Sequence, residues 1–370
     1  MDIRIAERLS RYETGIFASL DLKKEALIKA GRKVYNLSVG TPDFKPEEHI
    51  IQALVEAAKN PDNYKYSLRD LPELKQAVAD YYQKHFGTVI EPDEVMSIYG
   101  SQEGMAHIGL CLCNPGDIVL LPDPGYPIFE VGSRLGQAEI VYYPLLEENN
   151  FLPHLDQMDE EILKRTRYII VSYPSNPTGA VAPVSMYTEL IEYAKKYNFI
   201  IIHDNAYSEI IYDEHRGISF LSLPGAKEVG VEFFSLSKTF NLTGARVSFV
   251  IGNKQVLNAL NLLRSQIDYG MFYPIQYAAI AALSGSQEGV EAQRLNYQAR
   301  RDALCGGFRR IGWEVPNAKG TMFVWAKIPP KFQSSKEFCE ELMDKTGVIC
   351  TPGGAFGALG EGYVRFALVL

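Results

Sequence analysis

Short apolar runs alternate with longer amphipathic segments through the middle of the chain. The apolar runs are continuous, which is typical of strands that are buried on both faces of a sheet. Between them, residues 185–198 (SMYTELIEYAKKYN) place apolar side chains at helical spacing with charged side chains opposite. The pattern therefore predicts an α/β fold with a mainly parallel sheet covered by helices. The predicted strands are residues 95–100, 117–123, 168–174, 199–205, 231–237 and 247–253.

The pattern changes in the last quarter of the chain, where a long helical stretch is followed by further short elements. A strand is predicted at 323–329 and a helix at 335–347, which is typical of a smaller α+β unit. A chain of 370 residues is also long for a single core. We expect a large domain of residues 45–280 and a small, discontinuous domain made of 1–44 and 281–370, with a ligand site in the cleft between them.

Composition narrows the class of protein. The chain has 45 acidic and 37 basic residues, a net charge of -8 and no basic cluster, which argues against a nucleic-acid partner. Its first residues lack the apolar core of a secretory signal, and no uncharged stretch approaches the roughly 18 residues of a membrane span. Five cysteines without CxxC spacing, and no HExxH motif, argue against a disulfide framework and a metal site. We expect a soluble cytoplasmic protein that binds neither nucleic acid, membrane nor metal.

Polar side chains follow five of the predicted strands, at the point where each strand ends. Ligands of open parallel sheets bind at the carboxyl ends of the strands, so these side chains are candidates for one site. The segment 100–104 (GSQEG) also opens a helix, and amides at a helix N-terminus favour an anion. A carboxylate directly after a buried strand, as at Asp204, needs a cationic or hydrogen-bonding partner. The side chains placed in this way are Ser101, Gln102, Tyr126, Asn176, Asp204, Tyr207 and Lys238.

The chemistry of pyridoxal 5'-phosphate accounts for this set. Its aldehyde needs an amine with which to form a Schiff base, and Lys238 supplies one. A carboxylate beside the pyridine nitrogen keeps the ring protonated as an electron sink, which is the part expected of Asp204. The ring needs an aromatic face, Tyr126, and its phenolate oxygen needs the donors Asn176 and Tyr207.

The phosphate of the same cofactor needs amides, hydroxyl groups and a cation. The amides of Ser101 and Gln102 lie at the start of a predicted helix. The segment 235–246 (SLSKTFNLTGAR) adds the hydroxyl groups of Ser235 and Ser237 and the guanidinium of Arg246. This one segment would therefore contact both ends of the cofactor, with Lys238 at the aldehyde and the other three side chains at the phosphate.

Six segments together resemble the class I and II aminotransferases of fold type I, in order and at similar spacing over essentially the whole chain. The resemblance implies a large domain with a mainly parallel sheet plus a smaller α+β domain, bound pyridoxal phosphate and a homodimer with active sites at the subunit interface. It makes Lys238 the covalent anchor of the cofactor, and Lys238, Asp204 and Tyr207 the catalytic residues. The segments are NLSVGTPDF (36–44), DPGYPIF, YPSNPTG, DNAYSE, SLSKTFNLTGAR and GYVRFAL (362–368).

The resemblance also implies a substrate site. Arg365 matches the family arginine that holds the substrate α-carboxylate as a two-pronged fork, with Asn176 and Gly40 beside it. A family tyrosine that reaches the phosphate of the neighbouring subunit falls on Tyr66 or Tyr64, because the spacing is about one residue short. Two further departures are Asp70, where the family has glycine, and the end of the chain at Leu370, where relatives continue with a helix; the second indicates a truncated or partly observed chain.

The implied reaction is a ping-pong transamination between an L-amino acid and a 2-oxo acid such as 2-oxoglutarate. The amino acid displaces Lys238, and the freed amine moves a proton between the substrate α-carbon and the cofactor. The segment 265–276 and the lysine segment are most similar to bacterial members acting on LL-diaminopimelate, aspartate or alanine. A tyrosine that diaminopimelate enzymes often carry is Gly15 here, which weakens that assignment and leaves the donor open.

Three other functions deserve comparison. A carbon–sulfur lyase on the same fold would use the same cofactor ligands and eliminate rather than transaminate. A transcription regulator on this fold would need a DNA-binding domain ahead of residue 40. A nucleotide-binding dehydrogenase would carry GxGxxG or GxxxxGK after its first strand, and neither motif occurs.

Overall fold

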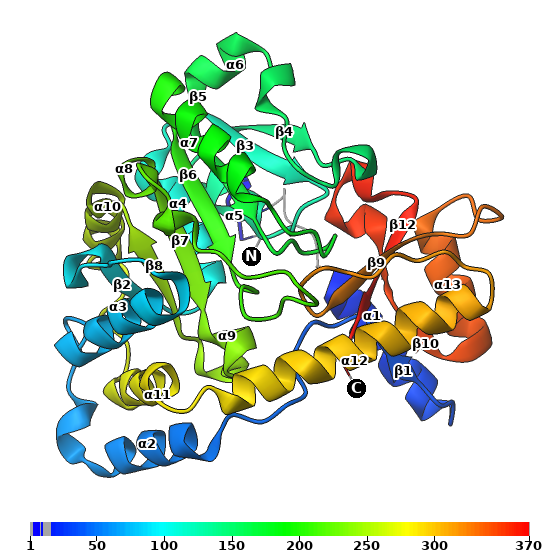
Figure 1. Ribbon diagram of the computed structural model, residues 1–370, viewed down its shortest axis with the longest axis horizontal. Helices are drawn as coiled ribbons and strands as arrows, with labels where there is room; N and C mark the ends of the chain where they lie inside the picture. Colours follow the sequence, from blue (N-terminus) through cyan, green and yellow to red (C-terminus); the bar gives the residue numbers. More distant parts are fainter. Residues whose placement is uncertain (1–2, 8, 10–15, 370) are drawn as a thin grey trace.

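The computed structural model describes residues 3–7, 9 and 16–369. Gly15, which bears on the amino donor, and Leu370, which bears on the chain end, lie outside the described residues. The main architecture is a seven-stranded sheet with helices on both faces (Figure 1).

The seven strands have the order β2-β8-β7-β6-β5-β3-β4. All neighbouring pairs are parallel except those made by β8, which is antiparallel to both β2 and β7. The predicted α/β fold with a mainly parallel sheet is therefore confirmed. Strand β4 was not predicted, and its side chains at the sheet edge are mostly exposed or half-buried rather than apolar throughout. The strands are β2 (Val95–Ile98), β3 (Ile118–Asp123), β4 (Glu139–Pro144), β5 (Thr166–Ser172), β6 (Ile200–Asn205), β7 (Gly230–Ser235) and β8 (Ser248–Gly252).

Successive side chains of the central strands enter two different cores, as the two-residue period of a strand requires. Along β5, Ile169 and Val171 join one apolar cluster, and Tyr168 and Ile170 join the other. The first cluster is covered by α2 (Glu48–Lys59), α3 (Pro72–Phe86), α6 (Glu160–Arg165), α7 (Val184–Tyr197), α8 (Ala226–Val229) and α11 (Tyr273–Ser284). The second is covered by α4 (Ser101–Leu112), α5 (Phe129–Leu135) and α10 (Lys254–Arg264).

A segment from the first tenth of the chain pairs with a segment near its end, beside this sheet. Strand β1 (Tyr35–Asn36) pairs in parallel with β10 (Val348–Ile349), and a three-stranded antiparallel sheet has the order β11-β12-β9. The division into a large domain and a discontinuous small domain stays a prediction. The remaining elements are α1 (Ile16–Lys29), α9 (Leu236–Thr239), α12 (Glu288–Arg310), β9 (Phe323–Lys327), α13 (Ser335–Thr346), β11 (Thr351–Pro352) and β12 (Tyr363–Ala367).

Among the described residues, no helix has the length and apolar character to cross a membrane. Among the same residues, no group of three or more His, Cys, Asp or Glu side chains could hold a metal ion. The five cysteines are free thiols.

Candidate active site

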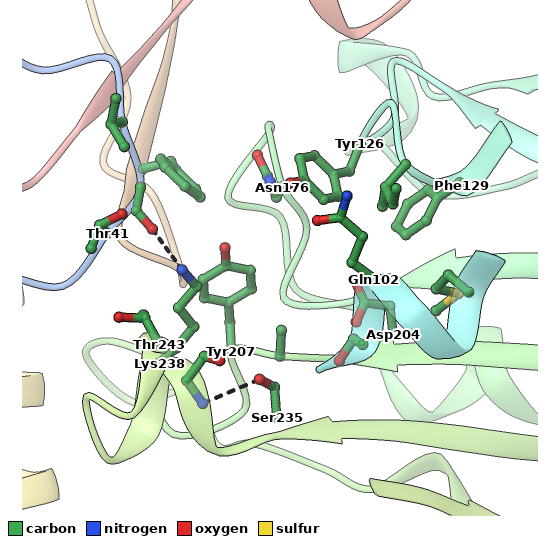
Figure 2. A pocket seen from close by; sticks show the side chains of 18 of the residues that line it. Thr41, Gln102, Tyr126, Phe129, Asn176, Asp204, Tyr207, Ser235, Lys238 and Thr243 are labelled. Carbon is green, nitrogen blue, oxygen red and sulfur yellow. Dashed lines mark hydrogen bonds between the residues drawn. The ribbon is translucent and has the colours of Figure 1, made fainter. Parts of the chain in front are cut away.

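A cavity of about 390 Å³ lies at the carboxyl ends of the parallel strands, and Figure 2 shows the side chains that face into it. Every predicted site residue except Tyr66 lines this cavity. They are Gly40, Ser101, Gln102, Tyr126, Asn176, Asp204, Tyr207, Ser235, Ser237, Lys238, Arg246 and Arg365.

Strand direction explains why residues so far apart in the sequence meet here. Strand β2 is antiparallel to β8, and β8 is antiparallel to β7, so β2 and β7 run the same way. The carboxyl ends of β2, β3, β5, β6 and β7 therefore share one edge of the sheet. Arg246 precedes β8 and reaches the same edge because β8 runs in the opposite direction.

Lys238 lies on the one-turn helix α9, directly after β7. Its Nζ donates a hydrogen bond to the carbonyl oxygen of Gly40 at 2.6 Å. Burial lowers the pKa of Lys238 to about 8, with the positive charges of Arg365 and Arg246 adding to the effect and Asp204 opposing it. A larger fraction of this amine is therefore neutral near pH 7 than of an ordinary lysine, and only the neutral amine is a nucleophile.

Asp204, the last residue but one of β6, is a buried carboxylate with few hydrogen bonds from the protein. The hydroxyl of Ser172 donates to its Oδ2 at a long 3.4 Å, and its Oδ1 has no hydrogen-bond partner among the described residues. Burial raises the pKa of Asp204 to about 6, against opposing effects of His203, Ser172 and Lys238. A protonated pyridine nitrogen would supply the donor that this carboxylate lacks, so the site fits pyridoxal phosphate at this pole.

The N-terminus of α4 fits the phosphate. Gly100 precedes the helix at a φ of 85°, and the Arg246 guanidinium lies so close to it that an added Cβ would overlap the guanidinium. The buried hydroxyl of Ser101 has no hydrogen-bond partner among the described residues. Helix amides, an uncommitted hydroxyl and a guanidinium are the donor set that a phosphate dianion requires.

Two side chains place hydrogen-bond donors between the Asp204 end of the cavity and its phosphate end. The carboxamide Oδ1 of Asn176 accepts a hydrogen bond from Nη1 of Arg365 at 2.8 Å, which leaves the Nδ2 donors of Asn176 toward the cavity. Burial raises the pKa of Tyr207 far above its ordinary value, so its hydroxyl is protonated and can donate. The ring of Tyr126 packs edge-on to Phe129, with ring centroids 6.0 Å apart.

Arg365 lies on β12 and is only 1% exposed. Its Nη2 donates to the carbonyl oxygen of Ser38 at 2.8 Å, and its guanidinium stacks 4.0 Å over the ring of Phe323. Burial lowers the pKa of Arg365 to about 10, so the side chain is still a cation at neutral pH. A carboxylate entering the cavity would meet a guanidinium that the protein already holds in place.

The predicted inter-subunit tyrosine does not reach the cavity of its own chain. Tyr66 is 77% exposed and packs against Tyr269, with ring centroids 4.8 Å apart. Tyr64 is also exposed, but its hydroxyl donates to the carbonyl oxygen of Ala58 at 2.9 Å. The side chain of Asp70 accepts a hydrogen bond from the amide of Ser97 at 2.8 Å and so ties this segment to β2.

Several lining residues were not predicted. Val39 and Thr41 flank Gly40 and could have been inferred from that position, and Thr243 stands within the lysine segment. An apolar residue of the second sheet, such as Phe323, carries no signal that distinguishes it from the core. The unpredicted lining residues are Val39, Thr41, Met105, Ile128, Phe129, Ala206, Thr243 and Phe323.

The sequence matches among known proteins are to aminotransferases. A family model described as aminotransferase class I and II matches residues 32–369. The chain is 44% identical over 367 residues to the LL-diaminopimelate aminotransferase of Halothermothrix orenii, covering 99% of this chain and 94% of that protein. It is 41% identical to the enzyme of the same name from Aquifex aeolicus, covering 99% and 95%.

Solved structures agree with the sequence matches. The substrate-bound structure of BacF from Bacillus subtilis superposes with a TM-score of 0.97 at 37% identity, covering 100% of this chain and 94% of that one. A probable N-succinyldiaminopimelate aminotransferase from Thermus thermophilus gives a TM-score of 0.91 at 33% identity, with 96% of each chain covered.

Proposed function

Because this chain belongs to the class I and II aminotransferases, enzymes of fold type I that depend on pyridoxal phosphate, we propose that its amino donor is LL-diaminopimelate or a related L-amino acid of the aspartate or alanine type. The proposed acceptor is a 2-oxo acid such as 2-oxoglutarate. The observation that carries the proposal is the set of relatives named for LL-diaminopimelate, together with one cavity lined by Lys238, Asp204 and Arg365. The aminotransferase matches do not favour a carbon–sulfur lyase.

We propose distinct roles for the residues at the two poles of the cofactor. When bound, pyridoxal phosphate supplies an aldehyde and an electron-withdrawing ring. Lys238 would anchor it covalently and, once displaced, carry a proton to and from the substrate α-carbon. Asp204 would hold a proton on the ring nitrogen. The groups that would hold the phosphate are the α4 amides at Ser101 and Gln102 and the side chains of Ser101, Ser235, Ser237 and Arg246.

The substrate would be oriented by its carboxylate. Arg365 would pair with the α-carboxylate in a two-pronged contact while Asn176 holds the guanidinium from the side. Asn176 would also donate a hydrogen bond from its Nδ2 to the phenolate oxygen of the cofactor. The hydroxyl of Tyr207 would donate to the same oxygen. Tyr126 would stack on the ring, and Gly40 would contribute main-chain atoms beside the substrate.

We also propose a homodimer. Aromatic and apolar side chains are exposed on the segments around residues 64–68 and 269–272, namely Tyr64, Tyr66, Leu68, Tyr269 and Phe272. A row of this type is unusual on the surface of a monomer. The hydroxyl of Tyr64 already has an acceptor in its own chain, so Tyr66 is the better candidate to reach the phosphate of the neighbouring subunit.

Subunit mixing tests the dimer and Tyr66 together. Lys238→Ala and Tyr66→Phe variants would each have low activity, but a mixed dimer contains one site with both native residues. Random mixing should therefore restore up to about one quarter of wild-type activity, as expected for active sites shared across a two-fold axis. A mixture no more active than its components would refute the shared site.

A donor panel tests the substrate assignment. The protein is loaded with pyridoxal phosphate and assayed with 2-oxoglutarate and LL-diaminopimelate, aspartate or alanine, following glutamate formation. Turnover with at least one donor is expected, with LL-diaminopimelate first. Cystathionine is run in parallel, and release of pyruvate and thiol from it, without glutamate formation from any donor, would contradict the proposal.

A further inference from the structure

One face of the long helix α12 contacts two segments that each contribute a residue to the cavity, one carrying Lys238 and the other carrying Gly40. Gln293, Tyr297 and Arg300 stand four and three residues apart, so their side chains share this face. In Figure 1 the helix runs from beside α9 to the side of the molecule that carries α13. It therefore lies against two segments, around residues 238 and 36–45, that are far apart in the sequence.

The Gln293 end of this face holds the residue that carries the amine. Nε2 of Gln293 donates a hydrogen bond to the main-chain carbonyl of Lys238 at 2.7 Å, and Gln293 is only 4% exposed. A hydrogen bond made away from solvent fixes geometry more firmly than an exposed one, because water does not compete for it. The main chain of α9 is thus held in register with α12.

The Arg300 end holds the segment that carries Gly40. Nη1 of Arg300 donates to Oδ1 of Asp43 at 2.7 Å and to the carbonyl oxygen of Leu368 at 2.9 Å. Its guanidinium lies 4.7 Å from the ring centroid of Phe44, and the ring of Tyr297 meets the same ring edge-on at 5.1 Å. Asp43 and Phe44 follow Gly40 by three and four residues, so these contacts help to place the Gly40 carbonyl from one side, while the bond from Arg365 to Ser38 holds the chain on the other side.

We propose that Arg300 is a positioning residue for transamination and that, with Gln293 at the other end of the face, it sets the Gly40 carbonyl against the amine of Lys238. The hydrogen bond from Nζ of Lys238 to Gly40 joins the two segments that α12 holds. The inference rests on the proposed role of Lys238 as proton carrier, because a displaced lysine must be kept within reach of the substrate α-carbon. A misplacement of about 1 Å in a reacting group can cost on the order of 100-fold in rate.

The ion pair between Arg300 and Asp43 is not a large source of folding stability. The side chains of Arg300 and Asp43 are 23% and 20% exposed, and pairs at such positions contribute little to stability. Loss of Arg300 should therefore change the reaction more than the folding of the protein.

The test compares Arg300→Met with Arg294→Met. Arg294 lies on the same helix and pairs with Glu291 at 2.6 Å, and it also donates to Ile211 and Gln298 rather than to residues 36–45. In the loaded enzyme, the maximal rate of the half-reaction with an amino donor should fall about tenfold or more in Arg300→Met and stay within about twofold in Arg294→Met. Arg300→Lys keeps the charge and should recover part of the rate. Asp43→Asn should slow the reaction too, and the double variant should be no slower than Arg300→Met, because the two residues act through one contact.

A second measurement needs neither cofactor nor turnover. The rate at which an amine-acylating reagent labels Lys238 in the apoprotein, followed by peptide mass spectrometry across pH, gives the pKa of this amine. The midpoint should rise by about half a unit or more in Arg300→Met, because an amine that is no longer held in place gains solvent and burial is the main cause of its lowered pKa, and it should stay in place in Arg294→Met.

The outcomes separate the inference from the proposed function. If the wild-type enzyme converts no donor, the proposed function fails, while the labelling experiment still decides whether α12 positions the amine. Equal behaviour of Arg300→Met and Arg294→Met in labelling would overturn the inference. So would a double variant, Asp43→Asn with Arg300→Met, whose loss of rate equals the product of the two single losses. If Arg300→Met does not fold, Asp43→Asn takes its place, because it keeps the contacts of Arg300 with Leu368 and Phe44. The same two measurements, the half-reaction rate and the labelling of Lys238, then decide whether the inference holds.

Discussion

Nη1 of Arg365 donates a hydrogen bond to Oδ1 of Asn176 at 2.8 Å, although the two residues are 189 positions apart. The contact joins β12 of the small antiparallel sheet to the segment after β5 of the large sheet. It orients both groups at once, because the carboxamide oxygen is used by Arg365 and the Nδ2 donors of Asn176 are left toward the cavity. The residue proposed to bind the substrate carboxylate and a residue proposed to bind the cofactor are therefore joined directly by one hydrogen bond.

Replacing Arg365 with lysine should keep the charge and remove the two-pronged geometry. We expect kcat/KM for the amino donor to fall about 100-fold, which corresponds to a loss of roughly 2–3 kcal/mol of carboxylate binding in the transition state. Steady-state kinetics measure this loss. Arg309→Lys, at the end of α12 and in contact with Val315 and Asn317, is the matched control and should leave kcat/KM unchanged. Equal values for the two variants would remove Arg365 from the substrate site.

The buried amine of Lys238 should make apoprotein stability depend on pH. The pKa of Lys238 is lowered from 10.5 to about 8 in the folded chain, so between these values the unfolded chain binds the proton more readily. Stability therefore rises with pH across this window, and below about pH 8 the cost of the buried charge is fully present. Apo Lys238→Met should exceed the wild type in free energy of unfolding by at most about 3 kcal/mol near pH 7, and the excess should vanish by about pH 10.5.

Urea unfolding of both apoproteins at several pH values measures this difference. Lys227→Met is a suitable control, since Lys227 is a part-exposed lysine whose Nζ pairs with Glu94 at 2.8 Å. Lys227→Met removes this ion pair and should not exceed the wild type in free energy of unfolding at any pH of the series. A Lys238→Met excess that is constant over the whole range would show that the amine is not held at a depressed pKa.

Gly100→Ala should weaken cofactor binding specifically. Gly100 and Gly116 both have positive φ, of 85° and 89°, so alanine is strained at either position. Only at Gly100 would the new Cβ meet another group, the guanidinium of Arg246, whereas at Gly116 nothing lies within 4 Å. We expect Gly100→Ala to raise the Kd for pyridoxal phosphate about tenfold or more, and Gly116→Ala to change only stability. Fluorescence titration of the two apoproteins checks this, and similar Kd values would contradict the placement of the phosphate.

The sequence predicted the strands of the large sheet well where they are buried on both faces. Edge strand β4 carried no such signal, because its residues between Glu139 and Pro144 are partly in solvent. The reversed direction of β8 was also not predictable, since an apolar run of the kind at 247–253 looks the same in either direction. Reversal matters for the site, because it brings Arg246 to the edge where the other strands end.

The candidate site was predictable because its residues sit at strand ends within recognisable segments. The contacts that hold those residues were not. Gln293 is an ordinary glutamine of a long helix, and its hydrogen bond to Lys238 spans 55 residues. The pairing of Arg300 with Asp43 spans 257 residues and depends on how α12 crosses the molecule. Side-chain partners of this kind follow from the packing of elements rather than from any local pattern.

The half-reaction of the loaded enzyme tests the central claim most directly. Purified protein is saturated with pyridoxal phosphate, freed of excess cofactor and mixed with an amino donor from the panel in the absence of any 2-oxo acid. The account predicts that the absorbance of the lysine-bound cofactor converts to that of its amine form, with one equivalent of 2-oxo acid released per site, and that Lys238→Ala does neither. A wild-type protein that takes up no pyridoxal phosphate, or that takes it up and shows no conversion with any donor, would contradict it.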